Sequence, residues 1–115
     1  MFVVYAIVAI VLSLMLLVSA FGKLTKMAPV VENLGKVGVE LSWFPGLAVL
    51  EILGAAGLLI GLGVAGLGIA AAIGVICYFV GALVFHFRAG DRSIGPPVLL
   101  LVLAIIALIT RIASA

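Results

Sequence analysis

The sequence predicts an all-α, polytopic membrane protein: a four-transmembrane-helix bundle with a short amphipathic helix between spans one and two. Hydrophobic residues make up 68% of the 115 residues and charged residues only 9%, whereas soluble domains average roughly 45–50% and about 25%. Four apolar runs approach or exceed the ~20 residues that cross a bilayer. Helices are predicted rather than strands, because these runs are apolar on every face instead of alternating.

The composition also excludes several classes of function. Six basic and four acidic residues are too few to form the extended basic patch that binds nucleic acid. The single cysteine, Cys77, lies in an apolar run, so an internal disulfide or a CxxC redox pair cannot form. We interpret Cys77 as a buried structural thiol, because reactive thiols need exposed, electropositive surroundings. The acidic residues and the one histidine show no metal-ligand spacing, so no metal site is predicted.

Residues 1–115 are predicted to form a single transmembrane domain with spans at about 2–22, 46–62, 67–88 and 97–112. The first span exceeds the ~7–15 apolar residues of a signal-peptide core, and no Lys or Arg precedes it, so we interpret it as retained. Pro45 and Pro96 open the second and fourth spans. Proline suits these positions, because the first turn of a helix makes no use of its N–H group.

The connection between the first two spans is too long for a simple turn and predicts an amphipathic helix over about residues 28–38. Glu32 and Lys36 pair on one face at i, i+4. The opposite, apolar face carries Val30, Val31, Leu34 and Val37. Such a helix either rests on the membrane surface or caps the mouth of the bundle.

Small residues predict a tight hairpin between the second and third spans. Gly57 and Gly61 form one small-xxx-small pair, and Ala70 and Gly74 form another. In lipid, such positions let two helix backbones approach closely.

The distribution of Lys and Arg predicts the orientation. With four spans, the 23–44 and 89–95 connections lie on one side of the membrane and both termini on the other. Only Arg111 belongs to the side of the termini. The first side holds Lys23, Lys26, Lys36, Arg88 and Arg92. The positive-inside rule therefore places the charged loops in the cytoplasm and both termini outside.

One acidic residue, Glu51, lies within a span, about 7 Å beyond Gly46 at the helical rise. A charge that faces lipid costs ~2.5–3.5 kcal/mol or more, so Glu51 is expected to point inward and find a partner. The available partners at that end of the bundle are Lys23, His86 and Arg88. The resulting cluster is either a salt bridge that fixes helix packing or the polar part of a functional pocket.

Further candidate residues lie around this cluster. Ser19 is one turn deeper than Lys23. The aromatic residues Tyr78, Phe79 and Phe85 either line an apolar pocket beneath the cluster or only pack against helices and lipid. The candidate ligand-binding residues are Ser19, Lys23, Tyr78 and Arg88, and the candidate acid–base pair is Glu51 with His86.

Three motifs in this order resemble the DoxX-like family of small four-helix bacterial membrane proteins. They are Ser19–Leu24 (SAFGKL), Leu50–Gly61 (LEILGAAGLLIG) and Phe85–Asp91 (FHFRAGD), and the resemblance covers essentially the whole chain. It implies a multi-pass protein of the bacterial plasma membrane. Members of the family are linked to thiosulfate:quinone oxidoreductase subunits and other membrane oxidoreductase complexes. The family's polar positions correspond to Lys23, Glu51, His86 and Arg88.

These observations support three hypotheses about function. The first is an accessory or binding subunit that holds a lipophilic small molecule, quinone-like or a lipid, in a polar-mouthed helical pocket. The second is a small membrane enzyme of the isomerase type, with Glu51 and His86 as its acid–base pair. The third and weakest is a proton-coupled exporter. The expected partners are the bilayer, the lipophilic ligand, and either a second copy of the chain or a membrane oxidoreductase; no cofactor other than quinone is suggested.

Overall fold

The structure, a computed structural model, describes residues 1–36, 38–90 and 94–115. Val37 of the predicted amphipathic face and Arg92 of the charge count lie outside the described residues. The elements are α1 (Phe2–Leu24), α2 (Ala28–Lys36), the 3-10 helix η1 (Leu41–Trp43), α3 (Phe44–Ile60), α4 (Ala65–Arg88) and α5 (Gly95–Ser114). Four of these helical segments are long and apolar enough to span a membrane. The all-α, polytopic fold class is confirmed, and each predicted helix end lies within about two residues of the observed one.

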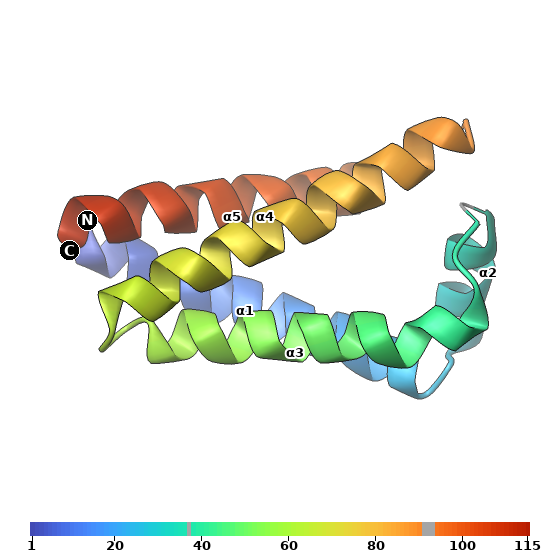
Figure 1. Cartoon of the computed structure of the whole chain (residues 1–115), viewed down its shortest axis with the longest axis horizontal. Helices are drawn as coiled ribbons and strands as arrows, with labels where there is room; N and C mark the ends of the chain where they lie inside the picture. Colours follow the sequence, from blue (N-terminus) through green and yellow to red (C-terminus); the bar gives the residue numbers. More distant parts are fainter. Residues whose placement is uncertain (37, 91–93) are drawn as a thin grey trace.

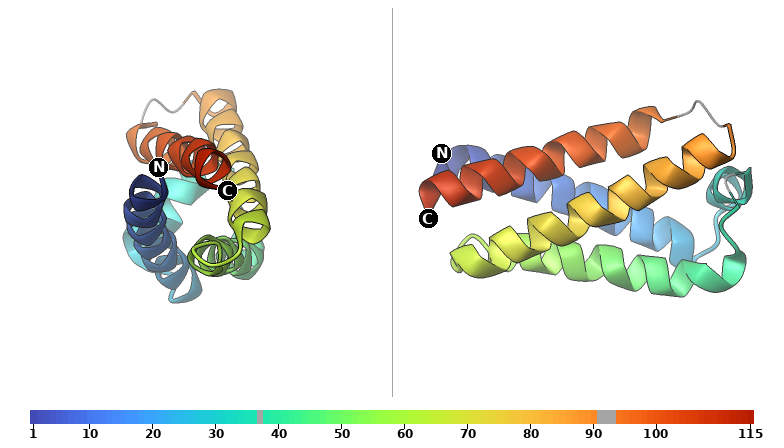
Figure 2. Two further views of the ribbon diagram at one scale, coloured as in Figure 1. Left: turned by 90° about the vertical axis from the view of Figure 1, so that its left-hand side faces the viewer. Right: turned by 45° about the horizontal axis from the view of Figure 1, so that its top comes forward.

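The four long helices form an antiparallel ring in which α1 packs against α3 and α5, and α4 packs against the same two helices. Both termini lie at one end of the bundle, and α2 lies across the other end (Figures 1 and 2). Only 22–33% of the residues in the apolar windows of these helices are buried. The remaining apolar surface faces outward, which is unfavourable in water and favourable in lipid.

The core is formed by stripes of residues spaced three or four apart. The buried stripe of α1 contains Tyr5, Ala9, Leu12 and Leu16. The buried stripe of α3 contains Phe44, Ala48, Ala55 and Leu58. Lys23 and Glu51 occupy positions in these same stripes and are themselves buried, so helical spacing directs both charges into the bundle.

Helices α3 and α4 approach most closely beside the turn that joins them. A methyl group added at Gly57 would lie 2.7 Å from Ala71 Cβ. One added at Gly61 would overlap the backbone of Gly68. The predicted tight hairpin is present, but the expected role of Ala70 and Gly74 is wrong: both are exposed. A methyl group at Gly74 would meet nothing within 4 Å.

Two carbonyl groups at the end of α3 accept hydrogen bonds from side chains of α1 and α5. The Tyr5 hydroxyl donates to the Leu58 carbonyl at 2.7 Å, and Arg111 Nε donates to the Gly61 carbonyl at 2.8 Å. The Arg111 guanidinium also lies over the Phe2 and Tyr5 rings, 5.3 and 5.5 Å from their centroids. Arg111 is therefore buried (6% exposed) and donates to a carbonyl group at the end of α3. Such a donor is needed because carbonyl groups at a helix end in lipid have no water to bond.

The amphipathic connector caps the mouth of the bundle. Val30, Val31 and Leu34 of α2 pack around buried Val39 and Phe44. The Trp43 ring stacks on Phe85 of α4 with centroids 5.9 Å apart. These contacts form a second, smaller core at the end opposite the termini.

We expect Gly61→Ala to lower the free energy of unfolding by about 1–3 kcal/mol, because the new methyl group overpacks the contact with Gly68. The backbone at Gly61 (φ −60°) accepts alanine without strain, so the cost is steric. Gly66→Ala on α4 is the matched control, since its methyl group would enter open space. Thermal unfolding in detergent tests the difference, and equal stability of the two variants would contradict the close approach.

Candidate functional site

A buried ion pair joins α1 to α3. Lys23 Nζ lies 2.6 Å from Glu51 Oε1, and the two side chains are 8% and 1% exposed. Of the three partners predicted for Glu51, the structure therefore selects Lys23. Glu51 is the eighth of the 17 residues of α3, about 10 Å along the helix at 1.5 Å per residue. It lies further from the start of its helix than the sequence predicted, because α3 begins at Phe44, before Gly46.

The Lys23 ammonium group is drawn into the bundle. Lys23 is the penultimate residue of α1, a position from which lysine side chains usually extend outward to the membrane surface. Here Nζ instead donates a hydrogen bond of 2.7 Å to Ser19 Oγ, one turn deeper. Ser19 and Glu51 together hold the positive charge on the inner side of the helix end.

The Glu51 carboxylate retains capacity to accept hydrogen bonds. Within the described part of the chain, neither of its oxygens has a hydrogen bond of regular geometry, although Oε1 is ion-paired with Lys23. Tyr78 of α4 is close enough to interact with Glu51 through its side chain. An ionised carboxylate offers about four lone-pair sites, so this arrangement leaves Glu51 able to bind a further donor.

In the described part of the chain, Tyr78 lines three cavities, two of which also include a member of the ion pair. The mouth cavity, of about 520 Å³, lies between α1, α2, α4 and α5 and includes Ser19, Lys23, Lys36 and His86. The bilayer cavity, of about 440 Å³, lies between α1, α3 and α4 and includes Leu50, Glu51, Leu53 and Gly74. The cap cavity, of about 250 Å³, lies under α2 and includes Leu34, Val39, Leu47 and Phe85.

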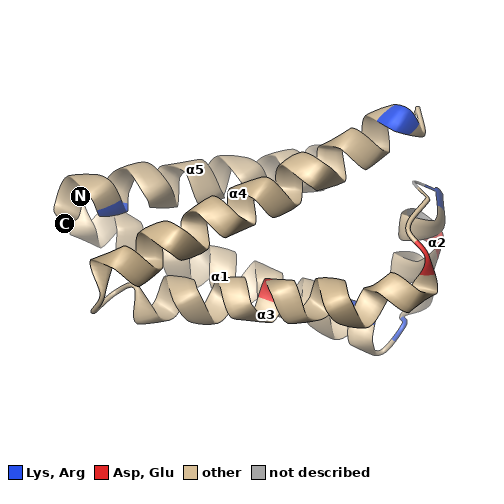
Figure 3. Ribbon diagram, in the orientation of Figure 1, with Lys and Arg blue, Asp and Glu red and all other residues tan. Residues whose placement is uncertain are grey.

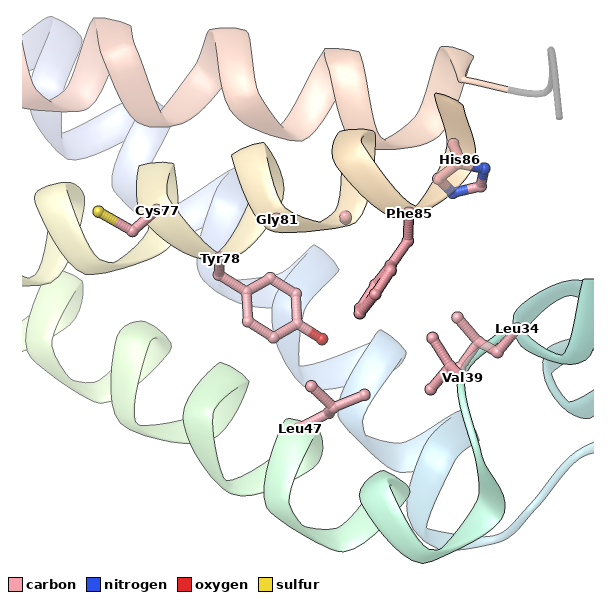
Figure 4. A pocket seen from close by; sticks show the side chains of 9 residues that line it. Leu34, Val39, Leu47, Cys77, Tyr78, Gly81, Phe85 and His86 are labelled. Atoms are coloured by element: carbon pink, nitrogen blue, oxygen red, sulfur yellow. The ribbon is translucent and has the colours of Figure 1, made fainter. Parts of the chain in front are cut away.

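The cap cavity shows how aromatic residues of α4 shape the interior. The Tyr78 hydroxyl and the Phe85 ring project from α4 into the space that faces Leu47 of α3 (Figure 4). Leu34 and Val39 close this space from the side of α2 (Figure 4). The aromatic residues predicted from the sequence thus line cavities rather than only filling helix contacts.

The remaining candidate residues differ in the cavities that they line. His86 lines the mouth and cap cavities, while Glu51 lines the bilayer cavity. Arg88 is exposed at the end of α4 and lines none of these three cavities. The interpretation of Cys77 as a buried thiol is wrong: it is exposed and lines the cap and bilayer cavities.

The sequence did not indicate the role of two kinds of cavity-lining residue. Lys36 contributes a second cation to the mouth cavity. The amphipathic pattern of residues 28–38 predicts this position only if that helix caps the mouth of the bundle. Gly74 and Gly81 line cavities, and a methyl group at either would meet nothing within 4 Å. Nothing in the sequence distinguishes these glycines from those that pack closely.

The charged residues concentrate around the end of the bundle that carries α2 (Figure 3). Across the described ranges, no group of three or more His, Cys, Asp or Glu residues could hold a metal ion. The site offers donors from Lys23 and Ser19 and an acceptor from Glu51, surrounded by apolar walls. This combination can bind the polar head of a lipophilic molecule.

Comparison with known proteins places the chain in a family. The family model described as DoxX-like matches residues 7–108, which is nearly the whole chain and includes the ion pair and all three cavities. No curated protein and no solved structure matches the chain significantly. This protein, with its four membrane-spanning helices, belongs to the DoxX-like family.

Proposed function

We propose that this protein binds a lipophilic small molecule, quinone-like or a lipid, within the membrane, with the polar head of the molecule at the Lys23–Glu51 pair. The observation that carries the proposal is the position of the pair, which lies between cavities instead of being packed on all sides. The two cavities that it borders, of about 440 and 520 Å³, are in the range of small-molecule sites, roughly 300–1,000 Å³.

The chemistry of the pair suits a head group with hydrogen-bonding oxygens. Lys23 and Ser19 line the mouth cavity and can donate to a carbonyl oxygen, as in a quinone, or to the oxygens of a lipid head group. Glu51 lines the bilayer cavity and can accept from a hydroxyl group. The apolar walls suit the tail of such a molecule.

An accessory role follows from a site that offers a donor, an acceptor and apolar walls to a bound lipophile. In this proposal the protein supplies a bound lipophile to a membrane oxidoreductase, the kind of complex to which DoxX-like relatives are linked. A second copy of the chain is the alternative partner. An acid–base enzyme that uses Glu51 and His86 receives no specific support from the site, since the two residues line different cavities.

The proposed location is the bacterial plasma membrane, with the α2 end of the bundle in the cytoplasm. Lys26, Lys36 and Arg88 are exposed at that end. At the other end, Arg111 is buried and bonded to the Gly61 carbonyl. The exposed Lys and Arg residues of the described part of the chain therefore all lie on one side, which strengthens the positive-inside argument.

Removing one member of the pair should destabilise the bundle unequally. Lys23→Met should cost more than Glu51→Leu, because it leaves a carboxylate halfway along α3, whereas a lone Lys23 at a helix end can extend to the interface. Breaking a buried pair typically costs about 3–5 kcal/mol, and apolar replacement of both partners is often neutral or better. The double variant should therefore unfold near the wild-type temperature in detergent. Equal losses in the single variants would contradict this asymmetry.

The same double variant tests the proposed function, because it should keep the fold and lose the polar site. Organic extraction and mass spectrometry of purified wild-type protein should recover a bound quinone or lipid that Lys23→Met/Glu51→Leu no longer retains. Gly66→Ala, away from the cavities, is the control and should retain it. Equal recovery from the double variant would show that the pair only joins helices. A wild-type protein that carries no lipophile and binds no added short-tailed quinone would overturn the proposal.

A further inference from the structure

The bilayer cavity opens sideways, towards lipid rather than water. Its walls include two large apolar residues of α3, Leu50 and Leu53, and two small residues of α4, Gly74 and Cys77. All four residues are exposed on the outer surface of the bundle and lie within helices long and apolar enough to span the membrane. A molecule dissolved in the bilayer would therefore meet this cavity without crossing the mouth or the α2 cap.

The opening follows from the way in which α3 and α4 diverge. The two helices are in close contact at Gly57 and Gly61 and separate towards the α2 end (Figures 1 and 2). On the diverging part of α4, Gly74 and Gly81 carry no side chain into the gap. The splayed helices and the missing side chains together leave space beside Tyr78.

An incompletely bonded carboxylate lies at the inner wall of this cavity. The Glu51 side chain is 1% exposed, and neither of its oxygens has a regular hydrogen bond among the described residues. Lys23 neutralises its charge from the side of the mouth cavity. Lys23 and Tyr78 occupy only part of the roughly four lone-pair sites of the carboxylate, so a donor arriving through the bilayer cavity would find an acceptor there.

We infer that the α3–α4 opening admits from the bilayer a lipophile whose head donates a hydrogen bond from a hydroxyl group to Glu51. Long-chain alcohols and the reduced, dihydroxy form of a quinone belong to this class, whereas ethers and esters of the same shape do not. The tail of the molecule lies between α3 and α4, beside Gly74. This inference rests on the proposed function and adds the head-group chemistry and the route of entry.

The head-group chemistry is tested with farnesol and its methyl ether, which share a tail and differ in the donor. Cys77, the single cysteine, lines the cavity and reports occupancy through its rate of alkylation by N-ethylmaleimide, followed by intact mass. Farnesol should slow alkylation at concentrations about tenfold below those needed for the ether, the effect of one hydrogen bond to a charged group. In Lys23→Met/Glu51→Leu the two probes should protect equally.

The route is tested with Gly74→Leu, which places a side chain in the opening without a backbone clash. Bound deuterated farnesol, measured by mass spectrometry, should fall several-fold relative to wild type. Gly66→Leu is the matched control on the same helix, because it also enters open space and lines none of the three cavities; it should bind as wild type does.

The outcomes separate this inference from the proposed function. Equal protection by alcohol and ether in the wild type would overturn the donor requirement while leaving a lipophile site in place. Unchanged farnesol binding in Gly74→Leu would overturn the entry route in the same way. Only a wild-type protein that neither carries an extracted lipophile nor responds to either probe would remove both the inference and the proposed function.

Discussion

The buried ion pair between Lys23 and Glu51 is the interaction around which the polar interior of this structure is arranged. Lipid cannot solvate the Glu51 carboxylate halfway along α3, so its charge must be neutralised within the bundle. The pair joins the end of α1 to the middle of α3, and the Tyr5–Leu58 hydrogen bond joins the same two helices nearer the termini. It also places the site's acceptor and its principal donor where apolar cavities meet.

Helices α3 and α4 are in close contact at one end and separate towards the other (Figure 1). Beside the connecting turn, glycines bring the backbones together, and Tyr5 and Arg111 donate hydrogen bonds to the carbonyls of Leu58 and Gly61. Towards the α2 end the helices diverge (Figure 1), and α2 with its small core covers the mouth. The close contacts at the turn hold α3 and α4 together, while the separated ends leave room for a cavity between them.

Most of the candidate site could be predicted from the sequence, because a charge in an apolar run has few possible partners. Ser19, Lys23, Glu51 and Tyr78 were all expected, and the structure brings them together. The choice of Lys23 over Arg88 could not be predicted. Both lie at the same end of the bundle, and only the rotation of each helix about its axis decides which one faces Glu51.

The sequence by itself determined the membrane class, the four spans, the DoxX-like motifs and the one-sided distribution of charge, since length and hydropathy are sufficient for these. Only the tertiary structure decided which faces of the helices pack. It buried Arg111, exposed Cys77, and separated the glycines that bring helices together from those that line cavities. The physical reason is that lipid is as apolar as the protein core, so burial against another helix leaves almost no hydropathy signal in the sequence.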